Sequence, residues 1–324
     1  MKRRLLILGM PIAVGSPWAA WAQATGTPAP TRPIRIIVPY PAGGPVDAAA
    51  RQLARGMADH LKQTVIVENK PGAGSTIGAA EVAKSAPDGH TVLFSLPDSF
   101  TYVPQLFKRL PYDPVRDLAP ITQLALTQPV MVLRADAAIT SLRQLNNSST
   151  GLSFGTWGPG TYPHLIAAAL ARVTGAELNI VAYKGGAPAV QDFMGGHIQM
   201  AITGIPQALD MQAKGMARIV AVAGTERSKL VPDVPTFVEQ GFAEPTFALP
   251  LWVGMAAAAG TPAALLSRLS EAATATLRTP EMQRFLQGFG WSALGNTPAE
   301  FRAQLEREAP VVAQAMRAAG VQPE

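Results

Sequence analysis

Short buried-strand patterns alternate with amphipathic helix patterns along most of this chain, and this alternation restricts the possible folds more than any other feature. Residues 34–39 read as a buried strand, residues 46–61 as a helix with one apolar face, and residues 64–67 as the next strand. A strand, a helix and a strand in this order form a βαβ unit. Repeated units of this kind predict an α/β fold with mainly parallel sheets.

The alternation extends into a second α/β block after a long extended segment, residues 119–134. A helix at 77–84 and a strand at 90–95 complete the first block. Two such blocks predict two lobes with a mixed, mainly parallel sheet in each and a ligand cleft between them. The second block has expected strands at 152–155, 179–183, 198–203 and 217–223, and expected helices at 162–173, 188–194 and 205–214.

The extended segments also suggest where the chain passes from one lobe to the other. We expect residues 34–126 together with 235–324 to form the first lobe, and residues 127–234 to form the second. A second crossing is expected near residues 247–255. Three C-terminal helices, at 262–277, 281–286 and 298–319, are expected to pack back on the first lobe.

The N-terminus has the three-part pattern of a secretory signal: a basic start, an apolar stretch and a small-residue end at Ala22-Gln23-Ala24. We expect residues 1–24 to be a cleaved signal peptide and residues 25–33, rich in proline and small residues, to be a flexible mature N-terminus. The pair Arg3-Arg4 leaves both the general secretory and the twin-arginine routes open. The mature protein is therefore expected in the periplasm.

Composition excludes several kinds of protein. With 324 residues, 48% of them hydrophobic, the chain can bury a sizeable core. Removal of the three basic residues of the signal lowers the formal net charge from +5 to +2, which is too mild to indicate a nucleic-acid partner. The chain has no cysteine, so disulfides and thiolate chemistry are excluded.

Two glycine-rich loops connect an expected strand to an expected helix, one in each block. They are Tyr40-Pro41-Ala42-Gly43-Gly44 and Thr156-Trp157-Gly158-Pro159-Gly160-Thr161. Backbone amides in such loops can approach an anion at the positive end of the following helix, and in open α/β sheets ligands lie beyond the carboxyl ends of the strands. A single such loop can equally be only a tight connection, but two in matching positions favour anion binding.

Side chains near these loops add candidate contacts. Tyr40 and Trp157 offer flat apolar walls, and Lys184 brings a cation. Asp47 is expected to support the first loop from the first helical turn and to pair with Arg51 four residues later. Four hydroxyls at expected strand ends could donate to a ligand: those of Ser95, Thr156, Thr161 and Thr203.

Catalytic and cofactor patterns are missing. The four histidines lack metal-ligand spacing, and the glycines of residues 72–78 are spaced GxGxxxG, which misses the dinucleotide fingerprint by one residue. There is no P-loop and no serine elbow. We therefore expect that the protein is not an enzyme and that it binds neither a cofactor nor a metal ion.

Ten segments of the chain form a specific combination. They are residues 37–44 with Asp47 and Arg51, 67–74, 87–89, 110–113, 154–165 with His164, 183–186, 195–196, 227–228, 232–236 and 259–262. Together they resemble the Bug family of extracytoplasmic receptors for tripartite tricarboxylate transporters. The resemblance covers the chain from about Pro33 to the C-terminal helices.

The resemblance implies a two-lobed, type II-like Venus-flytrap fold of the periplasmic binding proteins, in which the two glycine-rich loops grip a carboxylate. It also implies a tripartite tricarboxylate-type membrane permease as the partner of a monomeric receptor. The candidate ligand-binding residues are Tyr40, Ala42, Gly43, Gly44, Asp47, Ser95, Thr156, Trp157, Gly158, Gly160, Thr161, His164, Lys184 and Thr203.

Two departures from the family pattern bear on the ligand. Trp157 stands in a loop where the family usually has a serine-glycine run, and Asp98 lies in a segment that is usually apolar or small. If Trp157 enters the cleft, it would shrink the site or stack on an aromatic acid. Asp98, if it lies close to the ligand, would favour ligands that carry an amine or discourage bulky anions. A signalling co-receptor for a membrane sensor and a periplasmic enzyme on the same scaffold are the alternative functions.

Overall fold

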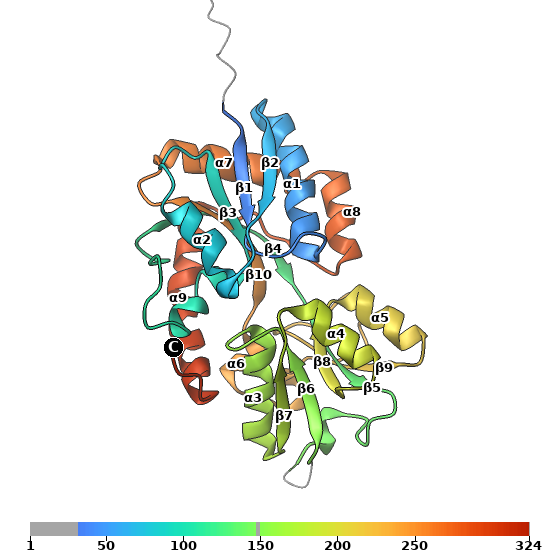
Figure 1. Ribbon diagram of the computed structural model, residues 1–324. Coiled ribbons are helices and arrows are strands. Elements are labelled where there is room, and N and C mark those ends of the chain that lie inside the picture. Colours follow the sequence, from blue (N-terminus) through green and yellow to red (C-terminus); the bar gives the residue numbers. More distant parts are fainter. Residues whose placement is uncertain (1–31, 147–149, 324) are drawn as a thin grey trace, which may run out of the picture. The chain divides into compact units, whose positions relative to one another are not determined.

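The computed structural model describes residues 32–146 and 150–323, which form two α/β lobes (Figure 1). The expected signal peptide, residues 1–24, and residues 25–31 of the expected mature N-terminus lie outside the described residues. Most predicted elements are confirmed to within two residues at each end. The predicted helix at 162–173, for example, is observed at Tyr162–Thr174.

The first lobe contains a six-stranded mixed sheet with the strand order β11-β4-β10-β3-β1-β2. β1 lies between β2 and β3 and is parallel to both, whereas β10 is antiparallel to β3 and β4. The carboxyl ends of β1, β2 and β3 therefore meet at one edge of the sheet. The strands are β1 (Ile34–Val38), β2 (Val65–Asn69), β3 (Thr91–Ser95), β4 (Leu118–Thr127), β10 (Leu251–Ala258) and β11 (Ser292–Ala293).

Helices cover both faces of this sheet, which explains why β1 is apolar at nearly every position. Ile36 and Val38 pack with Leu53 of α1, while Ile37 points to the other face and packs with Val82 of α2. Fully burying each such side chain stabilises the fold by about 1.5–3 kcal/mol. The helices of this lobe are α1 (Pro45–Leu61), α2 (Thr76–Ala83), α7 (Ala263–Leu277) and α8 (Pro280–Gly288), with short 3₁₀ turns η1 (Ala73–Ser75), η2 (Pro97–Ser99) and η3 (Val103–Gln105).

The second lobe contains a five-stranded mixed sheet with the order β7-β6-β8-β5-β9. β6 is parallel to β7 and β8, so the carboxyl ends of these three strands share one edge, and β5 is antiparallel to β8 and β9. The strands are β5 (Val130–Arg134), β6 (Leu152–Thr156), β7 (Leu178–Ala182), β8 (Met200–Thr203) and β9 (Ala217–Val222); the helices are α3 (Tyr162–Thr174), α4 (Gly186–Met194), α5 (Ile205–Ala213) and α6 (Pro245–Ala248), with η4 (Leu142–Gln144) and η5 (Val238–Gln240).

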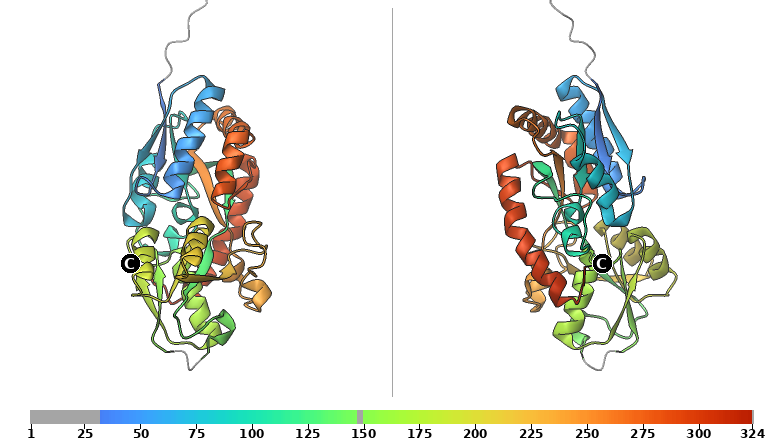
Figure 2. Two further views of the ribbon diagram at one scale, coloured as in Figure 1. Left: turned by 90° about the vertical axis from the view of Figure 1, so that its right-hand side faces the viewer. Right: turned by 60° about the vertical axis from the view of Figure 1, so that its left-hand side comes forward.

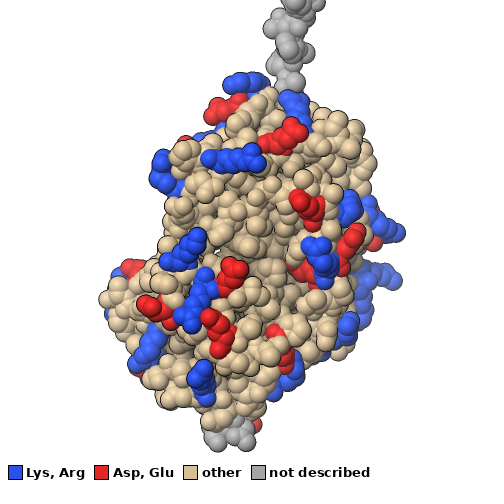
Figure 3. All heavy atoms as spheres, turned by 180° about the vertical axis from the view of Figure 1, so that it is seen from behind, with Lys and Arg blue, Asp and Glu red and all other residues tan. Residues whose placement is uncertain are grey.

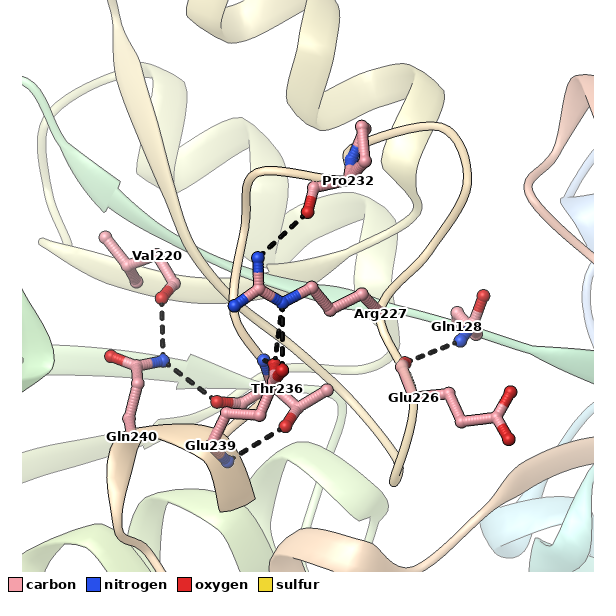
Figure 4. Close-up of polar contacts among 8 residues, drawn as sticks. All are labelled: Gln128, Val220, Glu226, Arg227, Pro232, Thr236, Glu239 and Gln240. Carbon is pink, nitrogen blue, oxygen red and sulfur yellow. Dashed lines mark hydrogen bonds and ion pairs between the residues drawn. The ribbon is translucent and has the colours of Figure 1, made fainter.

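Two chain segments cross between the sheets, and hydrogen bonds tie them together. One runs from β4 to β5 and the other from β9 to β10. Gln128 on the first donates to the carbonyl of Glu226 on the second at 3.0 Å (Figure 4). The amide of Ala223 donates to the carbonyl of Pro129 at 2.9 Å. The second crossing was expected as an extended segment at 247–255. Its first residues instead lie in the short helix α6, which starts at Pro245, and the strand β10 begins only at Leu251.

An arginine-centred network holds the loop after β9. Arg227 donates from Nε to both carboxylate oxygens of Glu239, at 3.0 and 2.9 Å, and from Nη1 to the carbonyl of Pro232 at 3.1 Å (Figure 4). Glu239 also accepts from the amide of Thr236 at 2.8 Å, and Gln240 donates to the carbonyl of Val220 at 3.0 Å. The long return to the first lobe is therefore ordered by its own polar contacts.

The C-terminal helix α9 (Pro298–Ala318) packs on both lobes, which corrects the expectation that it packs on the first alone. Phe301 near its start packs against Trp252 in the core of the first lobe. Val312 and Met316 near its end belong to the core of the second lobe. Figure 2 shows this helix, in red, running from the first lobe towards the second. The sequence shows only that one face of this helix is apolar, and two successive parts of that face meet different sheets.

Charged side chains are mixed on the surface. On the face opposite to that of Figure 1, basic and acidic residues are interspersed without a broad area of one sign (Figure 3). This agrees with the mild net charge of the mature sequence. Among the described residues, none of the helices combines the length and apolar character that a membrane span needs.

Candidate ligand-binding site

The carboxyl edges of the two sheets come together where the segment after β3 reaches the second lobe. Leu96 packs against the cores of both lobes, and Tyr102 lies in the core of the second. Leu106 faces Gly160, where an added Cβ atom would sit 2.1 Å from Leu106 Cδ2. The segment after β3 therefore links the region of the loop after β1, in the first lobe, to that of the loop after β6, in the second.

Asp47 organises the loop between β1 and α1. Its carboxylate accepts from the amide of Gly43 at 2.9 Å, from Asn69 Nδ2 at 2.9 Å and from Arg51, whose Nη2 lies 3.0 Å from Oδ1. Burial opposes ionisation of this carboxyl, but the hydrogen bonds from Arg51, Gly43 and Asn69 hold the pKa of Asp47 below its ordinary value. The expected Asp47–Arg51 pair is confirmed, and the amide of Gly43 is occupied within the chain.

The helix that follows this loop begins without a side-chain cap. Gly44 is the N-cap, Pro45 follows, and the first amide to donate within the helix is that of Ala48, to the carbonyl of Gly44 at 3.0 Å. Proline has no N–H, so the amides of Val46 and Asp47 are left to bind a partner outside the helix. Ala42 and Gly44 contribute two more amides that have no recorded acceptor among the described residues.

The matching helix of the second lobe starts in the same way. Thr161 is the N-cap of α3, yet its hydroxyl donates back to the carbonyl of Gly158 at 2.7 Å and does not cap the helix. The first helical bond runs from Leu165 to the carbonyl of Thr161 at 3.1 Å. The amides of Tyr162 and His164 are therefore also left for an outside acceptor, because Pro163 between them has none.

His164 and Gly160 lock the turn before α3. The amide of Gly160 donates to His164 Nδ1 at 2.7 Å, so this nitrogen is unprotonated and acts as the acceptor. Burial lowers the pKa of His164, which agrees with a neutral ring. Gly160 has φ of +66°, a conformation that favours glycine. His164 thus supports the loop through its ring, and the amide of Gly160 is occupied.

Trp157 lies against the loop between β7 and α4. Its indole Nε1 donates to the carbonyl of Ile202 at 3.3 Å, and its backbone carbonyl accepts from Gly185 at 3.1 Å. A Cβ atom added to Gly186 would sit 3.1 Å from Nε1. The ring is half-buried on the second lobe, while Lys184 of the same loop is exposed and has no ion pair among the described residues.

The four hydroxyls expected at strand ends all have partners within the chain. Thr156 donates to the carbonyl of Val181 at 3.3 Å, and Thr203 bonds the side-chain oxygen of Gln207. Ser95 is fully buried and lies 2.9 Å from Tyr40 Oη and 2.7 Å from Ser99 Oγ. A hydroxyl has one proton, so those protons serve the protein's own structure, as does that of Thr161.

Tyr40 connects this serine to Asp98. Its hydroxyl lies 3.0 Å from Asp98 Oδ2 and accepts from the amide of Leu96 at 3.2 Å. Beyond Ser95, Ser99 donates to Ser75 Oγ at 2.9 Å. Burial raises the pKa of Asp98 to about 6, and the hydrogen bond from Tyr40 opposes that rise. The candidate residues did not include Ser75, Ser99 or Asp98, although Asp98 had been noted as a departure from the family pattern.

Two buried tyrosines complete the polar groups of this region. Tyr102, from the segment after β3, and Tyr162, the first residue of α3, are each 1% exposed, and their hydroxyls have no hydrogen-bond partner among the described residues. The sequence could not identify these two hydroxyls as site groups, because each tyrosine occupies a position whose pattern predicts only a buried apolar side chain. Among the described residues there is also no cluster of His, Cys, Asp or Glu that could hold a metal ion.

Comparisons with known proteins agree on one family. A family profile described as the tripartite tricarboxylate transporter family receptor matches residues 49–309. Protein BugT of Bordetella pertussis is 32% identical over 321 residues, which cover 96% of this chain and 97% of BugT.

Solved structures of similar proteins share the fold. The periplasmic binding protein BugD is 31% identical with a TM-score of 0.80, covering 91% of this chain and 100% of BugD. R. palustris Rpa4515 with adipate is 26% identical with a TM-score of 0.82, covering 91% and 99%. MatC from Rhodopseudomonas palustris with bound malate is 26% identical with a TM-score of 0.76, covering 89% and 99%. The chain therefore belongs to the Bug, or tripartite tricarboxylate transporter receptor, family of solute-binding proteins.

Proposed function

We propose that this protein is a periplasmic receptor that captures a small carboxylate between its lobes and delivers it to a tripartite tricarboxylate-type permease. The observation that carries the proposal is the pair of uncapped helix starts, at Gly44 for α1 and at Thr161 for α3. Each combines free amides with the positive end of a helix dipole, and together they would hold one carboxylate from both sides. No arginine is needed for such a site.

The remaining candidate residues have supporting parts in this proposal. Asp47 and His164 fix the two loops, and Trp157 forms an apolar wall on the second lobe. Structures of similar proteins with adipate and malate, which are both dicarboxylates, support a small carboxylate, and a dicarboxylate in particular, as the ligand. The secretory pattern of residues 1–24 supports a periplasmic location.

The protein is proposed to bind its ligand reversibly without converting it, and to act as a monomer. The candidate loops offer amides and an apolar wall, whereas hydrolytic or transfer chemistry needs an activated nucleophile or paired acid and base groups. The signalling alternative differs from transport only in the membrane partner. Uptake that persists in a strain lacking the gene, together with a lost transcriptional response to the ligand, would favour it.

A binding screen tests the function. The mature protein, unfolded and refolded to remove any copurified ligand, is heated with and without aliphatic, hydroxy, amino and aromatic carboxylates. A ligand that binds only the folded state raises the melting temperature, because it stabilises that state by RT ln(1 + c/Kd), where c is the concentration of free ligand. We expect at least one class of carboxylate to do so without being consumed. The proposal would be contradicted if no carboxylate raised the melting temperature, or if the bound acid were converted to a product.

A further inference from the structure

Asp98 has one carboxylate oxygen inside the protein and one that is accessible. Oδ2 contacts Tyr40 at 3.0 Å. Oδ1 has no hydrogen bond within the described residues and is not among their fully buried unpartnered atoms, and the residue as a whole is half-buried. The residue lies in η2, directly after the carboxyl end of β3 and beside the loop that follows β1. Oδ1 is therefore available at the edge where the proposed function places the ligand.

A chain of hydroxyl groups continues inward from the other oxygen. It runs from Asp98 through Tyr40 and Ser95 to Ser99 and Ser75, with contacts of 3.0, 2.9, 2.7 and 2.9 Å. Ser75, at the inner end of the chain of hydroxyls, has a φ of +83°. This value is unusual for a serine and indicates that the surrounding structure holds the residue in place. Buried hydroxyl groups in such a chain fix the orientation of the carboxyl that ends it.

The number of protons in this chain depends on Asp98. Tyr40 gives its single proton to Asp98 Oδ2, so Ser95 gives its proton to Tyr40, and Ser99 gives its proton to Ser75. The contact between Ser95 and Ser99 is then left without a proton. A proton on Asp98 would be donated to Tyr40, which would allow Tyr40 to donate to Ser95 and Ser95 to Ser99. Oδ1 is an acceptor in both arrangements.

No positive group balances this carboxyl. The groups around it are the phenols of Tyr40, Tyr102 and Tyr112, which come from three different segments. Burial raises the pKa of Asp98, and no cationic side chain of the described residues contributes to it. A ligand ammonium is the group that would supply the missing charge.

We propose that Asp98 is a specificity residue that selects carboxylates carrying an ammonium group, its accessible oxygen Oδ1 accepting a hydrogen bond from that group. The inference rests on the proposed function, since it assumes a carboxylate held by the helix starts. It names the ligand class as zwitterionic amino acids rather than plain mono- or dicarboxylates. A second carboxylate placed at Oδ1 would meet an acceptor, and at neutral pH a like charge.

Matched ligand pairs test this inference by calorimetry. The probes are L-glutamate against glutarate and L-aspartate against succinate, which differ only in the amino group. We expect the wild-type protein to bind the amino member at least about tenfold more tightly at neutral pH, as a charge-assisted hydrogen bond would provide. Asp98→Asn should reduce that ratio to near one. Asp210→Asn, the same change at an exposed residue of α5, should leave the ratio unchanged.

Acidification gives a second readout. The preference of the wild-type protein for the amino ligand should fall as the pH drops through about 6, because Asp98 then gains a proton. In Asp98→Asn the preference should not change over this pH range. Tyr40→Phe removes a hydrogen bond that lowers the pKa of Asp98, so in this variant the preference should fall at a higher pH than in the wild-type protein. Both variants are first checked for wild-type far-UV circular dichroism.

The outcomes separate the two claims. Equal binding of the paired ligands by the wild-type protein, or a preference that Asp98→Asn retains, overturns the role of Asp98 and leaves the carboxylate receptor in place. If none of the four probes binds but the screen finds another carboxylate without an ammonium group, the inference is overturned and the receptor function stands. If the whole screen finds no carboxylate, the proposed function is contradicted, and the inference with it.

Discussion

At the scale of single residues, Asp47 is placed to hold its loop rather than to touch a ligand. The side chain of Asp47 is 5% exposed and joins Gly43, Arg51 and Asn69. The sequence could predict its pair with Arg51, because the two residues are four apart on a helix. It could not predict the contribution of Asn69, which comes from the neighbouring strand β2.

Loss of the Asp47 carboxylate should therefore destabilise the first lobe. We expect Asp47→Asn to lower the free energy of unfolding by about 1–3 kcal/mol, since the amide nitrogen cannot accept the bonds from Arg51 and Asn69. Urea denaturation measures this. The matched change Asp210→Asn, at an exposed ion pair, should lower the free energy of unfolding by less than about 1 kcal/mol.

The effect should also depend on pH. The folded-state pKa of Asp47 lies below its ordinary value of 3.8, so its contribution is present above that value and is lost as the pH falls through the lower folded-state pKa. The stability difference between wild type and Asp47→Asn should shrink in strongly acidic solution. A difference that stays constant down to the acid transition would show that the charge of Asp47 is not the stabilising feature.

At the scale of elements, periodicity located nearly every helix and strand but not what each one packs against. Helix α9 is the clearest case, because its apolar face reads the same along its length while its two ends join different cores. Between those ends lies Glu308, a carboxylate that is 4% exposed. It accepts from Trp252 Nε1 at 2.7 Å, from Thr101 Oγ1 at 3.0 Å and from Gln304 Nε2 at 3.3 Å.

Glu308→Ala should leave the indole N–H of Trp252 buried without an acceptor and leave Thr101 only its longer bond, to the carbonyl of Pro97. We expect it to lower the free energy of unfolding by about 2 kcal/mol. Glu308→Gln keeps one acceptor oxygen and should lower it less. Urea denaturation of both variants measures these losses. Equal stability of Glu308→Ala and wild type would contradict the structural role of this carboxylate.

The pH dependence has the opposite sign to that of Asp47. Burial raises the pKa of Glu308 in the folded state above its ordinary value of 4.5. The folded state thus favours the protonated form, and stability should be greatest below the unfolded-state pKa and decline as the pH rises through the folded-state pKa. Glu308→Gln should lack this decline.

At the scale of the whole molecule, the sequence predicted two lobes because the βαβ pattern restarts after a long extended segment. It also identified the two strand-helix loops by their glycines. What it could not supply were contacts between the lobes, since these depend on which loops meet in space. The contact of Gly160 in the second lobe with Leu106, from the segment after β3, is of this kind.

The contact between Gly160 and Leu106 should couple the two residues energetically. Gly160→Ala introduces a left-handed alanine, at roughly 1–2 kcal/mol, and a methyl group 2.1 Å from Leu106 Cδ2. We expect Leu106→Ala to relieve the second effect but not the first. A double-mutant cycle on unfolding free energies should give a favourable coupling. Strictly additive effects would mean that the two lobes do not meet at this point.

The central claim is that two uncapped helix starts, one in each lobe, hold the ligand's carboxylate, and calorimetric titration of cap variants tests it most directly. Gly44→Asp and Thr161→Asp place a carboxylate at backbone angles suited to an N-cap, so each occupies its own helix amides and repels an anion. The account predicts that each abolishes binding of the ligand found by the screen, while Thr279→Asp, the same change at the N-cap of α8, binds it as wild type does. Undiminished binding by folded Gly44→Asp and Thr161→Asp would contradict it.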